Sequence, residues 1–281
     1  LPDEFIRRLN AAAKREKPDA LIIGEVWEDA SNKISYSERR TYFQGGELDS
    51  VMNYPLRDAI LAFLNGGTAE HFAETMECIR ENYPRDVFYN LMNVIGTHDT
   101  ARALTLLGVS EEEWKMDRDS RAHYTLPMDR LETARRKLRL AAVIQFTMPG
   151  SPTIYYGDEA GRQGFEDPFN RRTYPWGAED RELLAFYRKL CALRADSDTL
   201  ARGELHFVES EGALLHYERV SDHARLNILV NRGHHAVHAR VQAVYAVDML
   251  EDAAFDQADS GGLHVTVPPE TAYILRCFGT P

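Results

Sequence analysis

The chain has 281 residues, 44% of them apolar, which is enough to fill more than one hydrophobic core. Its formal net charge is −11, and this acidic balance argues against a nucleic-acid-binding surface, which needs clustered Lys and Arg. No apolar run reaches the length of about 18 residues that a membrane span requires, so neither nucleic acid nor membrane is a predicted partner. A neutral ligand agrees better with this composition.

Cysteine usage gives a weaker signal. Cys78, Cys191 and Cys277 are far apart and form no CxxC pair, which predicts neither a disulfide framework nor a zinc site. We expect all three to be buried small apolar residues. From this usage we predict a cytoplasmic location. Because the chain opens at Leu1 rather than at a methionine, we expect its true start to lie upstream.

Helical and strand patterns alternate through the first part of the chain. Phe5, Leu9 and Ala12 recur at helical spacing after Pro2, and a long amphipathic helical pattern covers about 129–147. Four short apolar runs predict strands, and three of them end in an acidic residue: Leu21–Ile23 before Gly24 and Glu25, Asp49–Asn53, Leu91–Ile95 before Gly96 to Asp99, and Pro152–Tyr156 before Gly157 to Glu159.

Strands that are apolar along their whole length are typical of a parallel sheet covered on both faces, so the fold class predicted for residues 1–198 is α/β. After a helix at about 180–195, six strand-like runs near 205–209, 213–219, 225–231, 237–247, 263–268 and 272–278 predict an antiparallel β-sandwich domain over residues 199–281. In parallel α/β folds the ligand site lies at the carboxyl ends of the strands, which is where the acidic residues fall.

Glu25 lies at such a strand end, between Gly24 and the pair Val26 and Trp27. An indole beside a carboxyl can raise its pKa by desolvation, as a general acid requires. The alternative is an ordinary carboxylate that caps the next helix.

His98 and Asp99 follow the third strand, where Gly96 allows a sharp turn. An imidazole and a carboxylate side by side can bind vicinal sugar hydroxyls, but they can also form a buried His–Asp pair or ligate a metal. No third ligand stands at helical or hairpin spacing, so no metal site is predicted. Glycosidases need two carboxyl groups about the scissile bond, and a third can stabilise the charge of the transition state. Asp158 and Glu159 either serve there or organise a loop.

Sugar-binding side chains are predicted around these strand ends. Asp167, Arg171 and Arg172 belong to a polar loop after the fourth strand that either reaches a ligand or is a solvated surface loop. Flat aromatic faces beside polar groups suit sugar rings, and aromatic residues gather near the strand ends: Trp27, Tyr54, Tyr155, Tyr156, Phe169, Tyr174 and Trp176.

With these motifs in place, the chain resembles the α-amylase superfamily of glycoside hydrolases, and most closely its neopullulanase, cyclomaltodextrinase and maltogenic amylase branch. Gly24–Trp27 resembles the fifth-strand motif, Asn93–Asp99 the seventh-strand motif, Pro149–Glu159 the eighth-strand segment and Asp167–Arg172 the loop after it. Leu48–Tyr54 is similar to the sixth-strand region. The resemblance implies the C-terminal half of a (β/α)8 TIM barrel followed by the family's C-terminal sandwich.

The resemblance also implies roles for individual residues. Glu25 would be the acid/base, Asp99 would stabilise the transition state, and His98 would bind sugar hydroxyls, with Trp27, Asp167, Arg171 and Arg172 as further substrate-binding residues. The family's nucleophilic Asp lies in a Gly-x-Arg-x-Asp pattern after the fourth strand, and no such pattern occurs between Leu1 and Pro281. We therefore expect this chain alone to be inactive.

The partner implied is an α-glucan oligosaccharide, cleaved with retention of the α configuration. Transfer to another sugar, or a catalytically silent carbohydrate-binding or scaffold module, are the alternative functions. No cofactor is predicted, although the resemblance leaves calcium open for the parent enzyme. Unpaired strands at the edges of a half barrel would also favour a homo-oligomer.

Overall fold

The computed structural model describes residues 1–35 and 37–279. Four very short strands lie side by side in the order of the sequence: β1 (Ile23–Gly24), β4 (Ser50–Val51), β5 (Met92–Asn93) and β6 (Ser151–Pro152). Each runs parallel to the next, with Ile23 opposite Ser50 and Asn93 opposite Pro152, while a parallel bridge at Met52 joins β4 to β5. The parallel arrangement predicted from the four apolar runs is therefore confirmed.

The fourth strand is shorter than predicted. Thr153 N–H still donates to the carbonyl of Asn93 (2.8 Å), but the chain then leaves the sheet. Tyr155 and Tyr156 instead place their rings against the guanidinium of Arg102, at 4.2 and 4.7 Å from the ring centroids. Tyr155 and Tyr156, predicted as the end of this strand, therefore pack around a buried cation instead of continuing the strand.

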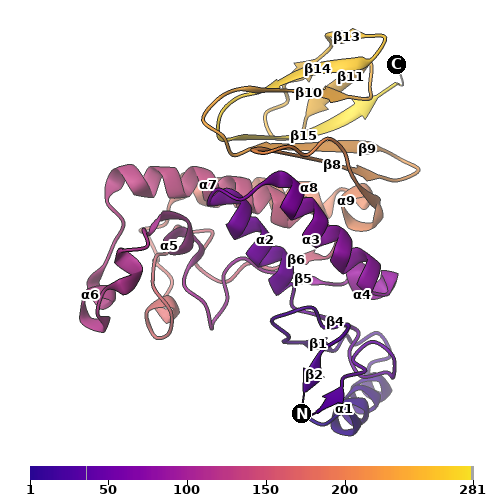
Figure 1. Cartoon of the computed structure of the whole chain (residues 1–281), viewed down its shortest axis with the longest axis vertical. Coiled ribbons are helices and arrows are strands. Elements are labelled where there is room, and N and C mark those ends of the chain that lie inside the picture. The colour runs from indigo at the N-terminus through magenta and orange to yellow at the C-terminus, as the bar shows by residue number, and fades with distance from the viewer. Residues whose placement is uncertain (36, 280–281) are drawn as a thin grey trace.

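Helices cover these strands and connect them (Figure 1): α1 (Asp3–Glu16), α2 (Tyr54–Leu64), α3 (Ala69–Asn82), α4 (Arg85–Tyr89), α5 (Ala103–Gly108), α6 (Arg118–His123), α7 (Met128–Thr147), α8 (Arg181–Ala195) and α9 (Asp198–Arg202). Polar caps fix several starts, as at α2, where Asn53 Oδ1 accepts from the N–H of Leu56 (3.2 Å). The prediction of a helix over about 129–147 is confirmed by α7, whose C-terminal half is buried on all sides.

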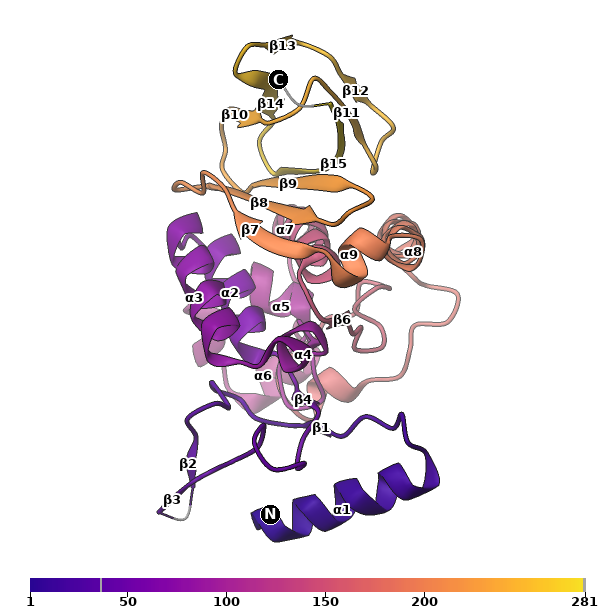
Figure 2. The same ribbon diagram turned by 90° about the vertical axis from the view of Figure 1, so that its right-hand side faces the viewer.

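Helix α1 forms where predicted but packs differently. Phe5 and Leu9, expected on its buried face, are 51% and 45% exposed, whereas Ile6 and Asn10 are buried. The buried side of the helix faces the 41–49 loop, where Asn10 donates through Nδ2 to the carbonyl of Glu47 (3.0 Å). Figure 2 shows α1 at the far end of the molecule from the C-terminal sheets.

The second part of the chain is antiparallel. A six-stranded sheet has the order β12-β11-β15-β9-β8-β7 and a three-stranded sheet the order β10-β14-β13. Their strands are β7 (Glu204–Phe207), β8 (Leu214–Val220), β9 (Arg225–Asn231), β10 (Val237–Val241), β11 (Tyr245–Asp248), β12 (Ala254–Phe255), β13 (Ala258–Asp259), β14 (Gly262–Val267) and β15 (Thr271–Phe278). The single strand predicted over 237–247 is in fact two, because the chain crosses there from one sheet to the other.

The six-stranded sheet is buried on both faces. Leu215, Tyr217 and Ile228 join the same hydrophobic core as the helices, whereas Leu229 and Leu275 join a second core against the three-stranded sheet. This alternation follows from the two-residue period of a strand. One continuous core therefore links the α/β region to the sheet region through α7 (Figure 2).

Composition predicted the absence of a membrane span and the burial of the three cysteines. Within the described residues, no helix is long and apolar enough to cross a membrane. The expectation of buried cysteines was wrong for Cys78 and Cys191, which are exposed, and Cys277 is only half-buried. Cys78 and Cys191 lie on the outer, solvent-facing sides of α3 and α8 rather than toward the core.

Candidate active site

Glu25 follows β1 directly. Gly24 is needed before it, since a Cβ at that position would lie 2.5 Å from Leu48 Cδ1. Val26 is buried and anchors the segment, while the Glu25 side chain is exposed. The only described hydrogen bond of its carboxylate comes from the Tyr54 hydroxyl, which donates to Oε1 at 3.0 Å.

The aromatic neighbours of Glu25 are arranged differently from the expectation. Trp27 does not cover the carboxylate: its ring stacks on Tyr54 at 4.5 Å and 11° and is 47% exposed. The desolvated pocket predicted for Glu25 is therefore absent, because the indole binds a ring instead. Burial raises the pKa of Tyr54 to about 12, with a contribution from the adjacent Glu25, so its hydroxyl stays protonated as a donor.

His98 and Asp99 lie on the turn that follows β5. Thr97 N–H donates to Thr100 Oγ1 (3.0 Å) and Asp99 N–H to Thr97 Oγ1 (3.3 Å), which closes the turn with side-chain hydroxyls. The side chains point out of it, with His98 Nε2 at 3.2 Å from Asp99 Oδ2 and exposures of 48% and 41%. They form a solvent-facing pair rather than the buried one that was considered.

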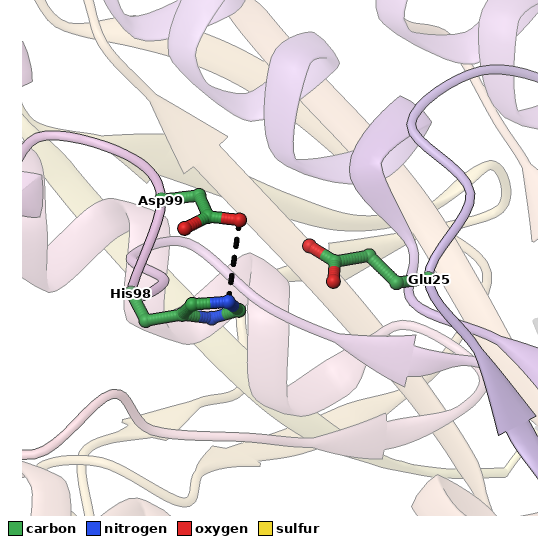
Figure 3. Close-up of side chains that lie close together, drawn as sticks. All are labelled: Glu25, His98 and Asp99. Carbon is green, nitrogen blue, oxygen red and sulfur yellow. Dashed lines mark ion pairs between the residues drawn. The ribbon is translucent and has the colours of Figure 1, made fainter.

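The structure brings Glu25 together with this pair. One side-chain ligand atom from each of Glu25, His98 and Asp99 lies within 4.8 Å of the others, and Figure 3 shows Glu25 reaching toward the pair from the opposite side. Glu25 is thus a candidate third ligand that sequence spacing did not show. Two carboxylates and one imidazole can hold a divalent ion, but Arg171 Nη2 already lies 3.2 Å from Asp99 Oδ1 and competes with a cation there.

The three loop residues predicted to bind substrate separate into two groups. Arg171 bridges two carboxylates, Asp99 and Asp167, with its Nε 3.1 Å from Asp167 Oδ1. Arg172 instead donates through its guanidinium to the carbonyl of Ala122. The loop therefore brings Asp167 and Arg171 to the Glu25–His98–Asp99 cluster and directs the charge of Arg172 to α6.

Sequence reasoning missed the buried residues beneath the cluster. Arg102 and Asn170 are fully buried. Asp158 is 4% exposed and 3.3 Å from Arg102 Nη1, so of its two predicted roles this burial favours organising a loop. Burial raises the pKa of Asp158 to about 7 although Arg102 opposes this rise. Tyr54 was noted only as one of several aromatics. An Asn within a polar loop gives no sequence signal of burial.

The chain is similar to known proteins along most of its length. The model of the alpha amylase catalytic domain matches residues 2–175. An amylopullulanase of Thermoanaerobacter thermohydrosulfuricus is 35% identical over 228 residues, which are 77% of this chain and 14% of that protein. A cyclomaltodextrinase of Geobacillus thermopakistaniensis is 31% identical over 276 residues, 95% of this chain and 41% of that protein.

Among solved structures, an Anoxybacillus alpha-amylase superposes with a TM-score of 0.80 at 21% identity, over 100% of this chain and 57% of that one. The fold is therefore shared along the whole chain, while the chain spans well under two thirds of each of these three proteins. Since the catalytic-domain model matches more than half of its residues, the chain belongs to the alpha-amylase family.

Proposed function

We propose that this chain carries the acid/base side of the active site of a retaining glycosidase that cleaves α-glucosidic bonds in α-glucan oligosaccharides. The observation that carries the proposal is the convergence of Glu25, His98 and Asp99 from two different strand ends, with their ligand atoms within 4.8 Å. The names of the relatives, amylopullulanase and cyclomaltodextrinase, support the class of substrate.

Each side chain has a role that fits its surroundings. Glu25 protonates the leaving glycosidic oxygen and later removes a proton from the attacking water. Tyr54, a protonated donor at 3.0 Å, orients the Glu25 carboxyl. Asp99 stabilises the oxocarbenium-like transition state by its charge, and His98 donates to a sugar hydroxyl.

The exposed ring of Trp27 offers a flat face to a sugar, held in place by its stack on Tyr54. Arg171 and Asp167 supply donors and acceptors for sugar hydroxyls further from the cleaved bond. Arg172 joins them only if its guanidinium leaves the carbonyl of Ala122.

The four parallel strands correspond, in this proposal, to the second half of a (β/α)8 barrel, with the sandwich after residue 198 as a separate domain. A nucleophilic carboxylate from outside residues 1–281 would form the covalent bond to the anomeric carbon. Without it the covalent step has no attacking group, so we expect no hydrolysis by the chain alone.

The test has two parts. The purified chain is incubated with maltotriose, cyclodextrin and pullulan. Turnover close to that of a full-length relative would refute the claim that these residues carry the acid Glu25 but lack the nucleophile. Maltotriose binding is then measured by calorimetry for wild type, His98→Ala and a control, His238→Ala, whose exposed imidazole lies on β10. Binding should weaken only in His98→Ala, and equal binding by all three proteins would contradict a sugar site at this cluster.

The silent-module alternative is disfavoured by the site itself. A module that has lost its chemistry has no need to keep the acid, the imidazole and the second carboxylate in contact, yet all three converge. Hydrolysis and transfer to another sugar use the same residues, and both remain within the proposal.

A second copy of the chain is the proposed partner of the open edge. Among the described strands β1 pairs only with β4, and Phe5 and Leu9 on the apolar side of α1 are exposed. Unpaired strand edges recruit further strands. Light scattering should show a mass that rises with concentration and a Phe5→Glu variant that stays monomeric, whereas a constant monomer mass for wild type would exclude this partner.

A further inference from the structure

The turn that bears His98 and Asp99 rests on three buried polar side chains. Arg102 and Asn170 are 0% exposed and Asp158 is 4% exposed, whereas His98 and Asp99 are about half exposed. None of the three can touch a bound sugar from that depth. Any influence they have on the reaction must therefore pass through the turn above them.

Asn170 makes the most direct contact. Its Nδ2 group donates to the carbonyls of His98 (2.7 Å) and Thr100 (2.8 Å), and the carbonyl of Thr97 lies 3.3 Å away. One amide group thus holds the peptide planes on both sides of His98, the second of which leads into Asp99, and the plane that follows Thr100. Because a peptide plane sets the direction of the neighbouring Cα–Cβ bond, Asn170 sets where the His98 and Asp99 side chains point.

Arg102 holds Asn170 in turn. Its Nε donates to the carbonyl of Asn170 (2.7 Å), and its Nη1 donates to the carbonyl of Tyr156 and to Asp158 Oδ1. The rings of Tyr155 and Tyr156 flank the guanidinium. Five contacts with four residues leave this buried cation little freedom to move.

Asp158 supports the other end of the turn. A Cβ on Gly96 would lie 2.1 Å from Asp158 Oδ2, so the carboxylate is packed directly against the backbone where β5 gives way to the turn. The turn is therefore supported at both ends, by Asp158 below Gly96 and by Asn170 below residues 97–100.

We propose that Asn170 is a positioning residue for the reaction, which acts by holding the carbonyls of His98 and Thr100 so that the His98 and Asp99 side chains meet the substrate preorganised. Arg102 and Asp158 act through Asn170 and Gly96. This inference rests on the proposed function, because it assigns a role in orienting the groups of that site.

The chain contains a matched control for its test. Asn231 is also 0% exposed and also binds three carbonyls through Nδ2, those of His235 (2.8 Å), Pro268 (2.9 Å) and Val267 (3.1 Å). It lies at the end of β9 in the sheet region. Asn170→Ala and Asn231→Ala remove the same buried amide with its three bonds to carbonyls. They differ in the segment that these bonds hold, and Asn231 Oδ1 also accepts from the N–H of Gly233 (2.8 Å).

The experiment compares the two variants by thermal unfolding, by the ring ¹³C–¹H NMR signal of His98 at fixed pH, and by maltotriose binding. His98→Ala identifies the signal. Both variants should lower the melting temperature similarly. Asn170→Ala alone should shift the His98 signal and raise the maltotriose dissociation constant about tenfold, the loss that about 1.4 kcal/mol of misplaced contacts produces. An unchanged His98 signal in folded Asn170→Ala would overturn the proposal.

A second variant keeps the test readable if Asn170→Ala does not fold. Arg102→Lys retains the charge but loses the Nε bond to Asn170, so it should move the same His98 signal by a smaller amount. If Asn170→Ala is unfolded and the His98 signal of Arg102→Lys equals that of wild type, the proposal is also overturned. If wild type fails to bind maltotriose while Asn170→Ala still shifts the His98 signal, the proposed function fails and the positioning role stands.

Discussion

Two segments carry the candidate site, the His98–Asp99 arm after β5 and the Glu25 arm after β1, and they differ in how many contacts hold them in place. The His98–Asp99 arm follows β5, whose Asn93 is fully buried and binds Asn53, Pro149 and Gln145 by hydrogen bonds. The Glu25 arm follows β1, whose two residues are only half-buried, and its carboxylate has a single described hydrogen bond. The candidate site thus combines a firmly held pair, His98 and Asp99, with Glu25, which few local contacts hold.

The difference reflects what surrounds each arm. Helix α7, buried around its C-terminal half, packs against β6 and the sheet region, so β5 and β6 lie next to the main core. Before β4, Val26 and Ala30 still join that core, but β1 is only half-buried and α1 exposes Phe5 and Leu9. We infer that the placement of Glu25 depends on few contacts and that the placement of His98 and Asp99 depends on many.

The largest expected effect comes from removing the buried cation of the rigid arm. Arg102→Met leaves Asp158 buried without its partner and removes the bond to Asn170, and should lower the free energy of unfolding by about 3–5 kcal/mol. Arg171→Met, on the exposed side of the same turn, should cost less than about 1 kcal/mol. Urea unfolding measures both, and equal losses would show that the buried support is no more important than the surface pair.

The pH dependence of stability should also originate in the rigid arm. Burial raises the pKa of Asp158 to about 7, opposed by Arg102 and reinforced by Glu159, so the folded protein keeps a proton that the unfolded chain releases near the ordinary value of 3.8. This proton's stabilising contribution is full below pH 3.8 and is lost as pH rises through 7, at up to about 1.4 kcal/mol per pH unit.

Asp158→Asn does not titrate and isolates this contribution. The unfolding free energy of wild type minus that of Asp158→Asn should fall from pH 4 to pH 7 and stay level above it. A difference that rises with pH over the same interval would mean that Arg102 keeps Asp158 ionised throughout.

A smaller effect is expected from one added methyl group. In Gly96→Ala the methyl meets Asp158 Oδ2 at 2.1 Å and should cost about 1–3 kcal/mol. Gly45→Ala, in the 41–49 loop between the Glu25 arm and β4, meets only the flexible end of Arg7 at 3.0 Å and should change stability by less than about 0.5 kcal/mol. If both variants lose the same amount, the two arms do not differ in packing as inferred.

The smallest effect concerns the one hydrogen bond of Glu25. Tyr54→Phe removes the donor at 3.0 Å, and since water can replace it at the exposed carboxylate, the cost should be about 1 kcal/mol. The stack on Trp27 survives in Tyr54→Phe but not in Tyr54→Leu, so Trp27 fluorescence should change only in the second variant. A fluorescence change in Tyr54→Phe would show that the hydroxyl also positions the indole.

Local patterns allowed much of this to be predicted. Apolar runs that end in Gly and a polar residue indicated parallel strands with Glu25, His98 and Asp99 at their ends, since side-chain periodicity reports which faces of an element are buried. The patterns failed where a polar or aromatic run had a buried partner, as at Tyr155 and Tyr156, which flank Arg102. They also failed at α1, where an apolar stripe faces solvent.

The sequence by itself determined the order of the four parallel strands, the long helix α7 and the chemical types at the strand ends, because side-chain periodicity depends on near neighbours in the chain. Only the tertiary structure decided that Glu25 reaches His98 and Asp99, that Trp27 stacks on Tyr54, and that Asn170 supports the turn from beneath. Such contacts join segments distant along the chain. They depend on the packing of the whole core, which no local pattern encodes.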